Sequence, residues 1–238
     1  MNLEQLLNDI PKIHLHGMIT WGLGENILRF IDKHVDENSR TLETGAGLST
    51  VLFAIKSTNH TCIVPSQEEI TRIICYCRER RISLRKTNFL IDRSENVLPR
   101  LPEDKLDLVL IDGCHGFPIP AIDWFYTAPK LRIGGILIVD DTHIWTGLVL
   151  KKFLQSEPEW RELKILSTSK AVVFVKIKEN CCKEWNQQPF VLKNSNYTRI
   201  LHIIQTTGAL LLRGQLSTLG AKLEKQLKIW NQKRMRCF

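Results

Sequence analysis

The stretch Arg40–Thr50, RTLETGAGLST, limits the fold of this chain more than any other. It predicts a strand that ends in a glycine turn and leads directly into a helix. Gly45 and Gly47 permit positive φ and a close approach of the backbone to a ligand, while Ser49 and Thr50 suit the first turn of the helix. Such a helix start presents unpaired N–H groups. An ordinary α/β domain also contains such turns, so the motif alone does not establish a ligand site.

Glu43 narrows the class of ligand. A carboxylate one turn before the glycines would repel a pyrophosphate, but it would accept hydrogen bonds from amino or hydroxyl groups. Thr50 stands where a dinucleotide fingerprint has its third glycine, and the Gly-Lys-Ser/Thr of a phosphate loop is absent from the sequence. The turn therefore favours a cationic or zwitterionic cofactor.

Charge divides the chain into two parts. The 238 residues, 43% of them apolar, are enough for one well-filled globular domain. Residues 1–179 contain 23 basic and 23 acidic side chains, whereas residues 180–238 contain 10 and 2, so the net charge of +8 lies entirely in the second part. We expect a folded domain over 1–179 and a basic amphipathic helical tail over 180–238.

The tail is predicted to be helical from Tyr197 onward. Apolar residues recur there at spacings of three and four, with basic residues opposite: Leu212, Leu216, Leu219, Leu223, Leu227 and Trp230. This stripe favours docking on the domain or on a second copy, which would give a homodimer. Contact with a membrane surface is the second alternative, and nucleic acid is disfavoured.

Location and redox state follow from what the sequence lacks. No run approaches the roughly 18 apolar residues of a membrane span, and residues 1–10 have neither the basic start nor the apolar core of a signal peptide. We expect a cytoplasmic protein, with peripheral membrane contact through the tail as an alternative. The seven cysteines lack zinc-finger spacing, which predicts reduced structural thiols.

Strands and helices alternate along the domain. Predicted helices include Glu25–Val35, Gln67–Arg80, Pro118–Leu131 and Gly147–Gln155. The predicted strands are Arg40–Thr44, Thr61–Val64, Ile82–Ile91, Leu106–Ile111, Ile136–Val139 and a terminal antiparallel pair, Leu163–Leu166 with Ala171–Lys178. This pattern predicts an α/β fold with a doubly wound, mostly parallel, Rossmann-like sheet of about seven strands.

Carboxylates follow both of the buried central strands. Asp112 follows one strand, with His115 three residues later, and Asp140 and Asp141 follow the next. Ligands of an open parallel sheet lie beyond the carboxyl ends of its strands, so we expect these side chains to meet Glu43 at one rim. Each has an ordinary explanation alone, as a turn or a helix cap, but packing does not explain the set.

Three carboxylates at close quarters repel one another unless a cation lies between them. Asp112, Asp140 and Asp141 are hard oxygen ligands of the kind that Mg²⁺, Ca²⁺ and Mn²⁺ prefer. Such an ion could chelate neighbouring substrate oxygens and hold a hydroxyl as an alkoxide. Histidine exchanges protons near neutral pH, so His115 is a candidate base and, with Asp112, a candidate catalytic residue.

Three motifs together resemble a known family. Residues 43–49 match an acid-x-G-x-G-x-S cofactor loop, residues 108–115 match a strand followed by Asp-Gly-x-His, and residues 132–141 match a Gly-Gly strand that ends in two acids. With these motifs, over about residues 20–178, the chain resembles the class I S-adenosylmethionine-dependent methyltransferases, and within them catechol O-methyltransferase and its relatives.

The resemblance implies particular roles for these residues. His115 falls where metal-dependent members carry a catalytic lysine, and the three aspartates fall where those members bind Mg²⁺. Ser66 stands where relatives carry a ribose-binding acid, and Arg93 precedes Ser94 in a loop that reads Gly-Asp-Ser in many relatives. The implied contacts of the cofactor S-adenosylmethionine are Glu43, Gly45, Gly47, Ser49, Ser66, Ser94 and Asp112.

The expected activity is methyl transfer to an oxygen of a small molecule or glycan-type hydroxyl, assisted by Mg²⁺. The reaction implied is an in-line displacement at the sulfonium methyl group, to which the protein contributes proximity and desolvation. Two alternatives stay open: a Rossmann-type enzyme that uses a nucleotide, and an inactive methyltransferase-like binding module that uses its basic tail.

Overall fold

The computed structural model describes residues 1–14, 23–103, 105–164, 166, 170–179 and 183–212. The chain divides into two units, residues 1–182 and residues 183–238.

A seven-stranded sheet forms the centre of the first unit, in the order β3-β2-β1-β4-β5-β7-β6. Its strands are β1 (Arg40–Thr44), β2 (Asn59–Ile63), β3 (Thr87–Leu90), β4 (Leu106–Ile111), β5 (Leu131–Val139), β6 (Trp160–Glu162) and β7 (Val172–Lys176). The first five strands pair in parallel, and β7 pairs antiparallel with both β5 and β6. The predicted doubly wound, mostly parallel sheet is confirmed.

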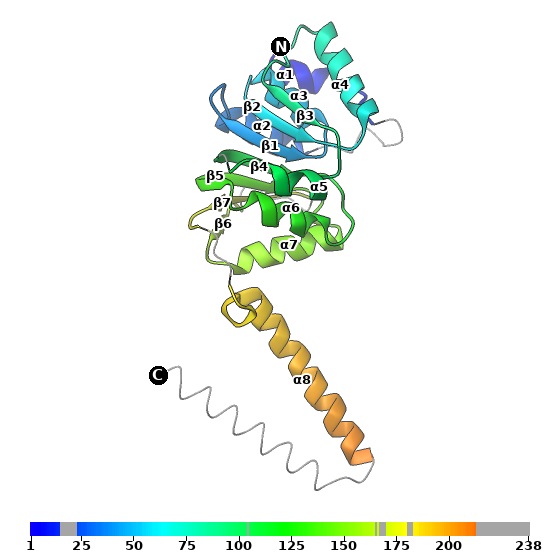
Figure 1. Ribbon diagram of the computed structural model, residues 1–238, viewed down its shortest axis with the longest axis vertical. Helices are drawn as coiled ribbons and strands as arrows, with labels where there is room; N and C mark the ends of the chain where they lie inside the picture. Colours follow the sequence, from blue (N-terminus) through cyan, green and yellow to red (C-terminus); the bar gives the residue numbers. More distant parts are fainter. Residues whose placement is uncertain (15–22, 104, 165, 167–169, 180–182, 213–238) are drawn as a thin grey trace. The chain divides into compact units, whose positions relative to one another are not determined.

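Helices cover both faces of this sheet (Figure 1). One layer contains α1 (Leu3–Asn8), α2 (Glu25–His34), α3 (Leu48–Ile55) and α4 (Gln67–Glu79). The other contains α5 (Ser94–Val97), the 3₁₀ turn η1 (Leu98–Arg100), α6 (Ile119–Thr127) and α7 (Trp145–Ser156).

Strand β4 illustrates why the central strands are almost wholly apolar. Leu108 and Leu110 pack beneath the α1–α4 layer, while Val109 and Ile111 pack beneath the α5–α7 layer. Side chains of a strand point alternately to the two faces, and here both faces are covered. The strand therefore lacks a solvent face that would need polar residues.

Several predicted boundaries in this unit are wrong, and the strand predicted over Ile82–Ile91, for example, covers only Thr87–Leu90. The helix predicted to reach Leu131 ends at Thr127, because Leu131 already pairs with Leu106 as the first residue of β5. Strand β5 continues past Gly134 and Gly135 with a shift of register against β4, and Gly134 has a positive φ of 82° there. Tertiary pairing with β4 thus overrides a helical sequence pattern.

The strand predicted over Leu163–Leu166 lies earlier. Strand β6 covers Trp160–Glu162 and pairs antiparallel with β7, where Trp160 is opposite Lys176. Burial of the Trp160 side chain in the core decides this register. Residues 167–169 of the predicted turn between the two strands lie outside the described residues.

The second unit contains η2 (Trp185–Gln187) and α8 (Pro189–Leu212), so the helix begins earlier than the predicted Tyr197. Tyr197, Ile200 and Ile204 are each more than half exposed on α8. The predicted stripe beyond Leu212 lies outside the described residues. Among the helices described, none is both long enough and apolar enough to cross a membrane.

The carboxyl ends of β1 and β4 meet at the point where the strand order reverses. The Asp112 N–H donates to Thr44 O at 3.0 Å, and the Gly45 N–H donates to Ile63 O at 2.9 Å. Gly45 has a φ of 89°, and a Cβ atom there would lie 2.1 Å from the Asp112 carbonyl oxygen. Only glycine fits this position, for both reasons.

We expect Gly45→Ala to lower the free energy of unfolding by at least about 2 kcal/mol, because the backbone of Asp112 would have to move. Chemical denaturation followed by circular dichroism measures this. Gly47→Ala is the matched control: φ at Gly47 is −172°, and a Cβ there meets no described atom closer than His14 Nε2 at 3.8 Å. It should lose no more than about 1 kcal/mol as a helix cap. Equal losses would refute the explanation from close approach.

Candidate active site

A cavity of about 990 Å³ opens at the carboxyl ends of β1, β4 and β5. Its lining comes mainly from the loops that follow these strands. Among the predicted site residues, it includes Gly45, Gly47, Ser49, Ser94, Asp112, His115, Asp140 and Asp141. The structure therefore brings the three predicted clusters together at one rim, while their individual roles stay predictions.

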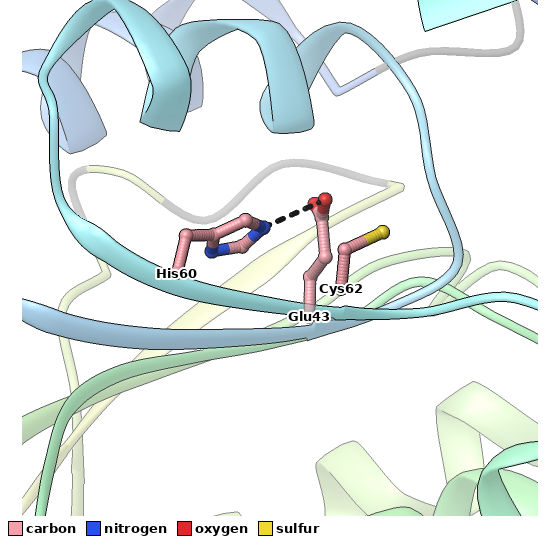
Figure 2. Close-up of side chains that lie close together, drawn as sticks. All are labelled: Glu43, His60 and Cys62. Atoms are coloured by element: carbon pink, nitrogen blue, oxygen red, sulfur yellow. Dashed lines mark hydrogen bonds and ion pairs between the residues drawn. The ribbon is translucent and has the colours of Figure 1, made fainter. Parts of the chain in front are cut away.

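Glu43 and Ser66 do not line this cavity. Glu43 is 1% exposed, and its carboxylate lies beneath α3, where Ser49, Thr50 and His60 donate hydrogen bonds to it (Figure 2 shows the His60 contact). Ser66 is the N-cap of α4 and accepts a hydrogen bond from the Glu69 N–H at 3.2 Å. Both side chains support the walls of the site from within the protein.

The cavity also contains residues that the sequence did not single out. His14 and Glu69 line it together, with His14 Nδ1 2.9 Å from Glu69 Oε1, and Lys170 lines it from the segment before β7. Glu69 could have been found, since an acid three residues after a helix-capping Ser66 is a recognisable pattern. His14 comes from a segment without a periodic signal.

His115 and Asp141 form a close pair of ionisable groups in the cavity, between the loops that follow β4 and β5. His115 Nε2 lies 2.9 Å from Asp141 Oδ2, and His143 Nδ1 lies farther from the same carboxylate, at 3.5 Å from Oδ1. The Thr146 hydroxyl donates to the His115 carbonyl oxygen at 2.7 Å, which ties the start of α7 to the loop after β4. Asp141 has a φ of 50°, unusual for a residue other than glycine.

Burial and like charges act together on the aspartates. Burial raises the pKa of Asp112 well above its usual range, and the negative charges of Asp140, Asp141 and Glu43 raise it further. Burial likewise raises the pKa of Asp140, although His115 and His143 oppose the rise. A cation between these groups would relieve both the burial cost and the repulsion.

One group of side chains has the chemistry and spacing of a metal site. Ligand atoms of Asp112, His115 and Asp141 all lie within 4.8 Å of one another. Two carboxylates and an imidazole suit Mn²⁺ and related divalent ions, and the two carboxylates suit Mg²⁺. Asp140, predicted as the third ligand, is not part of this group.

The two glycines of the loop after β1 occupy different surroundings. Gly45 is explained by the protein itself, through the Asp112 carbonyl, but no described atom crowds Gly47. The loop faces open cavity at Gly47, and the Gly47 N–H is held by Thr50 Oγ1 at 2.9 Å. The absence of a Cβ there leaves room for a ligand against the backbone.

A family of methyltransferase domains matches residues 42–142. These residues include the glycine loop, Asp112, His115 and both acids after β5. Over these residues the chain is similar to a methyltransferase domain, and they contain most of the parallel part of the sheet described above. A comparison with curated proteins found no match.

Solved structures agree with this methyltransferase fold. A Corynebacterium glutamicum protein is 19% identical with a TM-score of 0.54, over 75% of this chain and 89% of that one. A Podospora anserina methyltransferase bound to S-adenosylhomocysteine is 15% identical with a TM-score of 0.51, over 64% and 76%. A Staphylococcus aureus protein, proposed to be a caffeoyl-CoA O-methyltransferase, is 14% identical with a TM-score of 0.50, over 73% and 89%.

Asp123 of α6 is a buried acid behind the wall of the cavity, next to the lining residues Ser94 and Thr44. It is fully buried, and neither carboxylate oxygen has a hydrogen-bond partner among the described residues. Burial raises its pKa from 3.8 to about 6, with a smaller contribution from the charge of Glu95. The hydroxyls of Ser94 and Thr44, which line the cavity, offset part of this rise without completing a hydrogen bond.

We expect Asp123→Asn to stabilise the domain more at pH 8 than at pH 5. The raised pKa means that folded Asp123 holds its proton more tightly than unfolded Asp123, so its contribution to stability falls as the pH rises from about 4 to about 6 and stays low above that. The difference between variant and wild type should change by about 1 kcal/mol between these pH values. Thermal unfolding at both pH values measures it, and a pH-independent difference would contradict the assignment.

Proposed function

We propose that the domain transfers a methyl group from S-adenosylmethionine to a hydroxyl of a small molecule or glycan. The observation that carries this proposal is the His115–Asp141 pair, 2.9 Å apart in the cavity that also contains the glycine loop. If Asp141 accepts the proton on Nε2, the Nδ1 atom of His115 is left with a free lone pair. His115 is then a general base, and Asp141 orients it.

The proposed reaction is a single displacement. The acceptor oxygen attacks the methyl carbon as the carbon–sulfur bond breaks, the bonding electrons stay on sulfur, and the hydroxyl proton passes to His115. The products are the methyl ether and S-adenosylhomocysteine. Because sulfonium methyl groups are reactive, the protein mainly supplies alignment and the removal of water from the nucleophile.

The side chains present also fit a divalent cation. Asp112 and Asp141 would hold it, with His115 next to them. When bound, the ion would orient the acceptor and lower the pKa of its hydroxyl. The raised pKa of Asp112, due to burial and then to its acidic neighbours, is consistent with a site that receives positive charge.

Two exposed aromatic rings support an acceptor with a flat or apolar face. Phe117 lines the cavity and Trp145 begins α7; their side chains are 70% and 64% exposed, and their ring centroids lie 5.9 Å apart. Aromatic rings left in solvent beside polar catalytic groups are typical of sites that stack a phenol or the apolar face of a sugar.

The three aspartates at the strand ends favour this cofactor over the alternatives. Asp112, Asp140 and Asp141 would attract a sulfonium and an ammonium group but repel the pyrophosphate of a dinucleotide. An inactive binding module would have no need for a histidine and a carboxylate held 2.9 Å apart. Both arguments support a functioning methyltransferase.

We expect S-adenosylhomocysteine to bind at micromolar or tighter affinity and NAD to show no binding, because only the former lacks a pyrophosphate. Isothermal titration calorimetry with each compound measures this. Binding of NAD in preference to S-adenosylhomocysteine would favour the nucleotide-using alternative.

For catalysis, we expect His115→Ala to lower methyl transfer from radiolabelled S-adenosylmethionine by at least about 100-fold, in a screen of phenol and glycan acceptors. The affinity for S-adenosylhomocysteine should stay unchanged. His143→Ala is the matched control, because His143 lies near the same carboxylate but at 3.5 Å, and it should change the rate only a few-fold.

Equal effects of the two substitutions would refute the role of His115 as the base. In the same assay, a loss of activity in EDTA that Mg²⁺ or Mn²⁺ restores would support the cation. An unchanged rate in EDTA would remove the cation from the proposal and leave the His115–Asp141 pair.

A further inference from the structure

A continuous group of buried polar side chains lies beneath α3, on the side of the cofactor loop that faces away from the cavity. Glu43 of β1 and His60 and Cys62 of β2 point to the same face of the sheet (Figure 2). The Thr41 hydroxyl of β1 contacts His60, and all four side chains belong to residues that are 1% exposed or less. The strand register places Thr41 opposite His60 and Glu43 opposite Cys62. Burial of four polar or thiol side chains costs free energy unless each finds a hydrogen-bond partner.

Glu43 connects this block to the cofactor loop. Its carboxylate accepts hydrogen bonds from the Ser49 hydroxyl at 2.6 Å and from the Thr50 hydroxyl. Thr50 in turn accepts the Gly47 N–H at 2.9 Å. The position of Glu43 therefore decides the position of the Gly47 amide and of Ser49, both of which line the cavity.

His60 fixes Glu43 from the neighbouring strand. Its Nε2 atom lies 3.0 Å from Glu43 Oε1, and its Nδ1 atom lies 2.8 Å from the Thr41 hydroxyl. The imidazole also stacks on Phe53 of α3, with ring centroids 4.3 Å apart and an interplanar angle of 21°. Both nitrogens and one face of the ring are thus held, and a buried, fully bonded network of this kind is rigid.

The Thr41 hydroxyl extends this network away from the cavity. It lies 3.1 Å from the Thr58 hydroxyl, which in turn donates to the Phe53 carbonyl oxygen at 3.4 Å. The network therefore begins at the C-terminal end of α3 and ends at the loop that precedes the same helix. It anchors both ends of α3 to the sheet.

Glu43, His60 and Cys62 are also residue types that bind transition metals, with ligand atoms within 4.8 Å of one another. Hydrogen bonds account for them without an ion. Three donors already occupy the Glu43 carboxylate, and the Cys62 thiol donates to the Gly45 carbonyl oxygen at 3.4 Å. Burial raises the pKa of Cys62 well above its usual range, which keeps the thiol protonated and unsuited to metal binding.

We propose that His60 is a positioning residue of the cofactor site, acting through Glu43 to hold the Gly47 amide and Ser49 in the geometry that receives S-adenosylmethionine. This inference rests on the proposed cofactor. It also assigns Glu43 a role beneath the loop, where its charge is used to fix two hydroxyl groups. A carboxylate suits this role because it accepts several hydrogen bonds at once.

Two substitutions of His60 separate positioning from simple packing. In His60→Gln, the terminal amide can reach the position of Nε2 and donate to Glu43. In His60→Asn, the shorter amide reaches only the position of Nδ1, so it keeps a partner in Thr41 and loses Glu43. Calorimetry should give an affinity for S-adenosylhomocysteine within about 3-fold of wild type for His60→Gln and at least about 10-fold weaker for His60→Asn.

The control is Leu154→Ala, in α7 beneath the opposite face of the sheet, where a fully buried side chain is removed far from the loop. It should lower the melting temperature and leave the affinity unchanged. Should His60→Asn fail to fold, Thr41→Val removes the Nδ1 partner at nearly constant shape, and it should weaken binding about 3-fold.

Hydrogen exchange of the Gly47 amide gives a readout that needs no ligand. It should be at least about 10-fold faster in His60→Asn than in His60→Gln or Leu154→Ala. Wild-type affinity and Gly47 exchange in His60→Asn, with only a lower melting temperature, would overturn the positioning role. Failure of the wild type to bind S-adenosylhomocysteine would instead overturn the proposed cofactor and this inference with it.

Discussion

The contact between Gly45 and the carbonyl group of Asp112 is the constraint on which the rest of the first unit depends. It lies where the strand order reverses, so the chain leaves β1 toward one helical layer and leaves β4 toward the other. The loops diverge from that point and leave the cavity between them. A side chain at position 45 would separate the two strand ends. The absence of a Cβ atom at position 45 therefore allows the glycine loop and the acidic loops to share a site.

Electrostatics then selects what this cavity can receive. Asp112 and Asp140 both have pKa values raised first by burial, and they have Asp141 as a common negative neighbour. In a sheet of this type that binds a dinucleotide, the same rim would need to accommodate phosphates. Here the rim carries carboxylates instead. Their charged forms are stabilised only when a positive charge or protons lie next to them. The proposed sulfonium cofactor, with or without a divalent ion, would satisfy that requirement.

The glycine loop after β1 has one side that faces the cavity and one side that packs on the protein interior, and the two sides differ in chemistry. On the cavity side, the absence of a side chain at Gly47 leaves its backbone accessible. On the interior side, Glu43 is enclosed by Ser49, Thr50 and His60. The same short motif thus contains one residue that suits a ligand and one that suits the protein interior. The sequence alone does not show which of these residues faces the ligand and which faces the interior. Successive side chains of a strand point to opposite faces of the sheet, and one of those faces is covered by a helix.

The sequence by itself determined the parallel α/β architecture, the glycine loop and the acids at the ends of β4 and β5, because hydrophobic period and strand-end position are local properties of the chain. It did not determine the start of β5, the partners of Glu43 or the presence of Glu69 and His14 in the cavity. Those depend on the register between strands and on which loop covers which strand end. His60 is 17 residues from Glu43 in the chain and meets it only because β1 and β2 pair in one particular register, which tertiary packing alone decides.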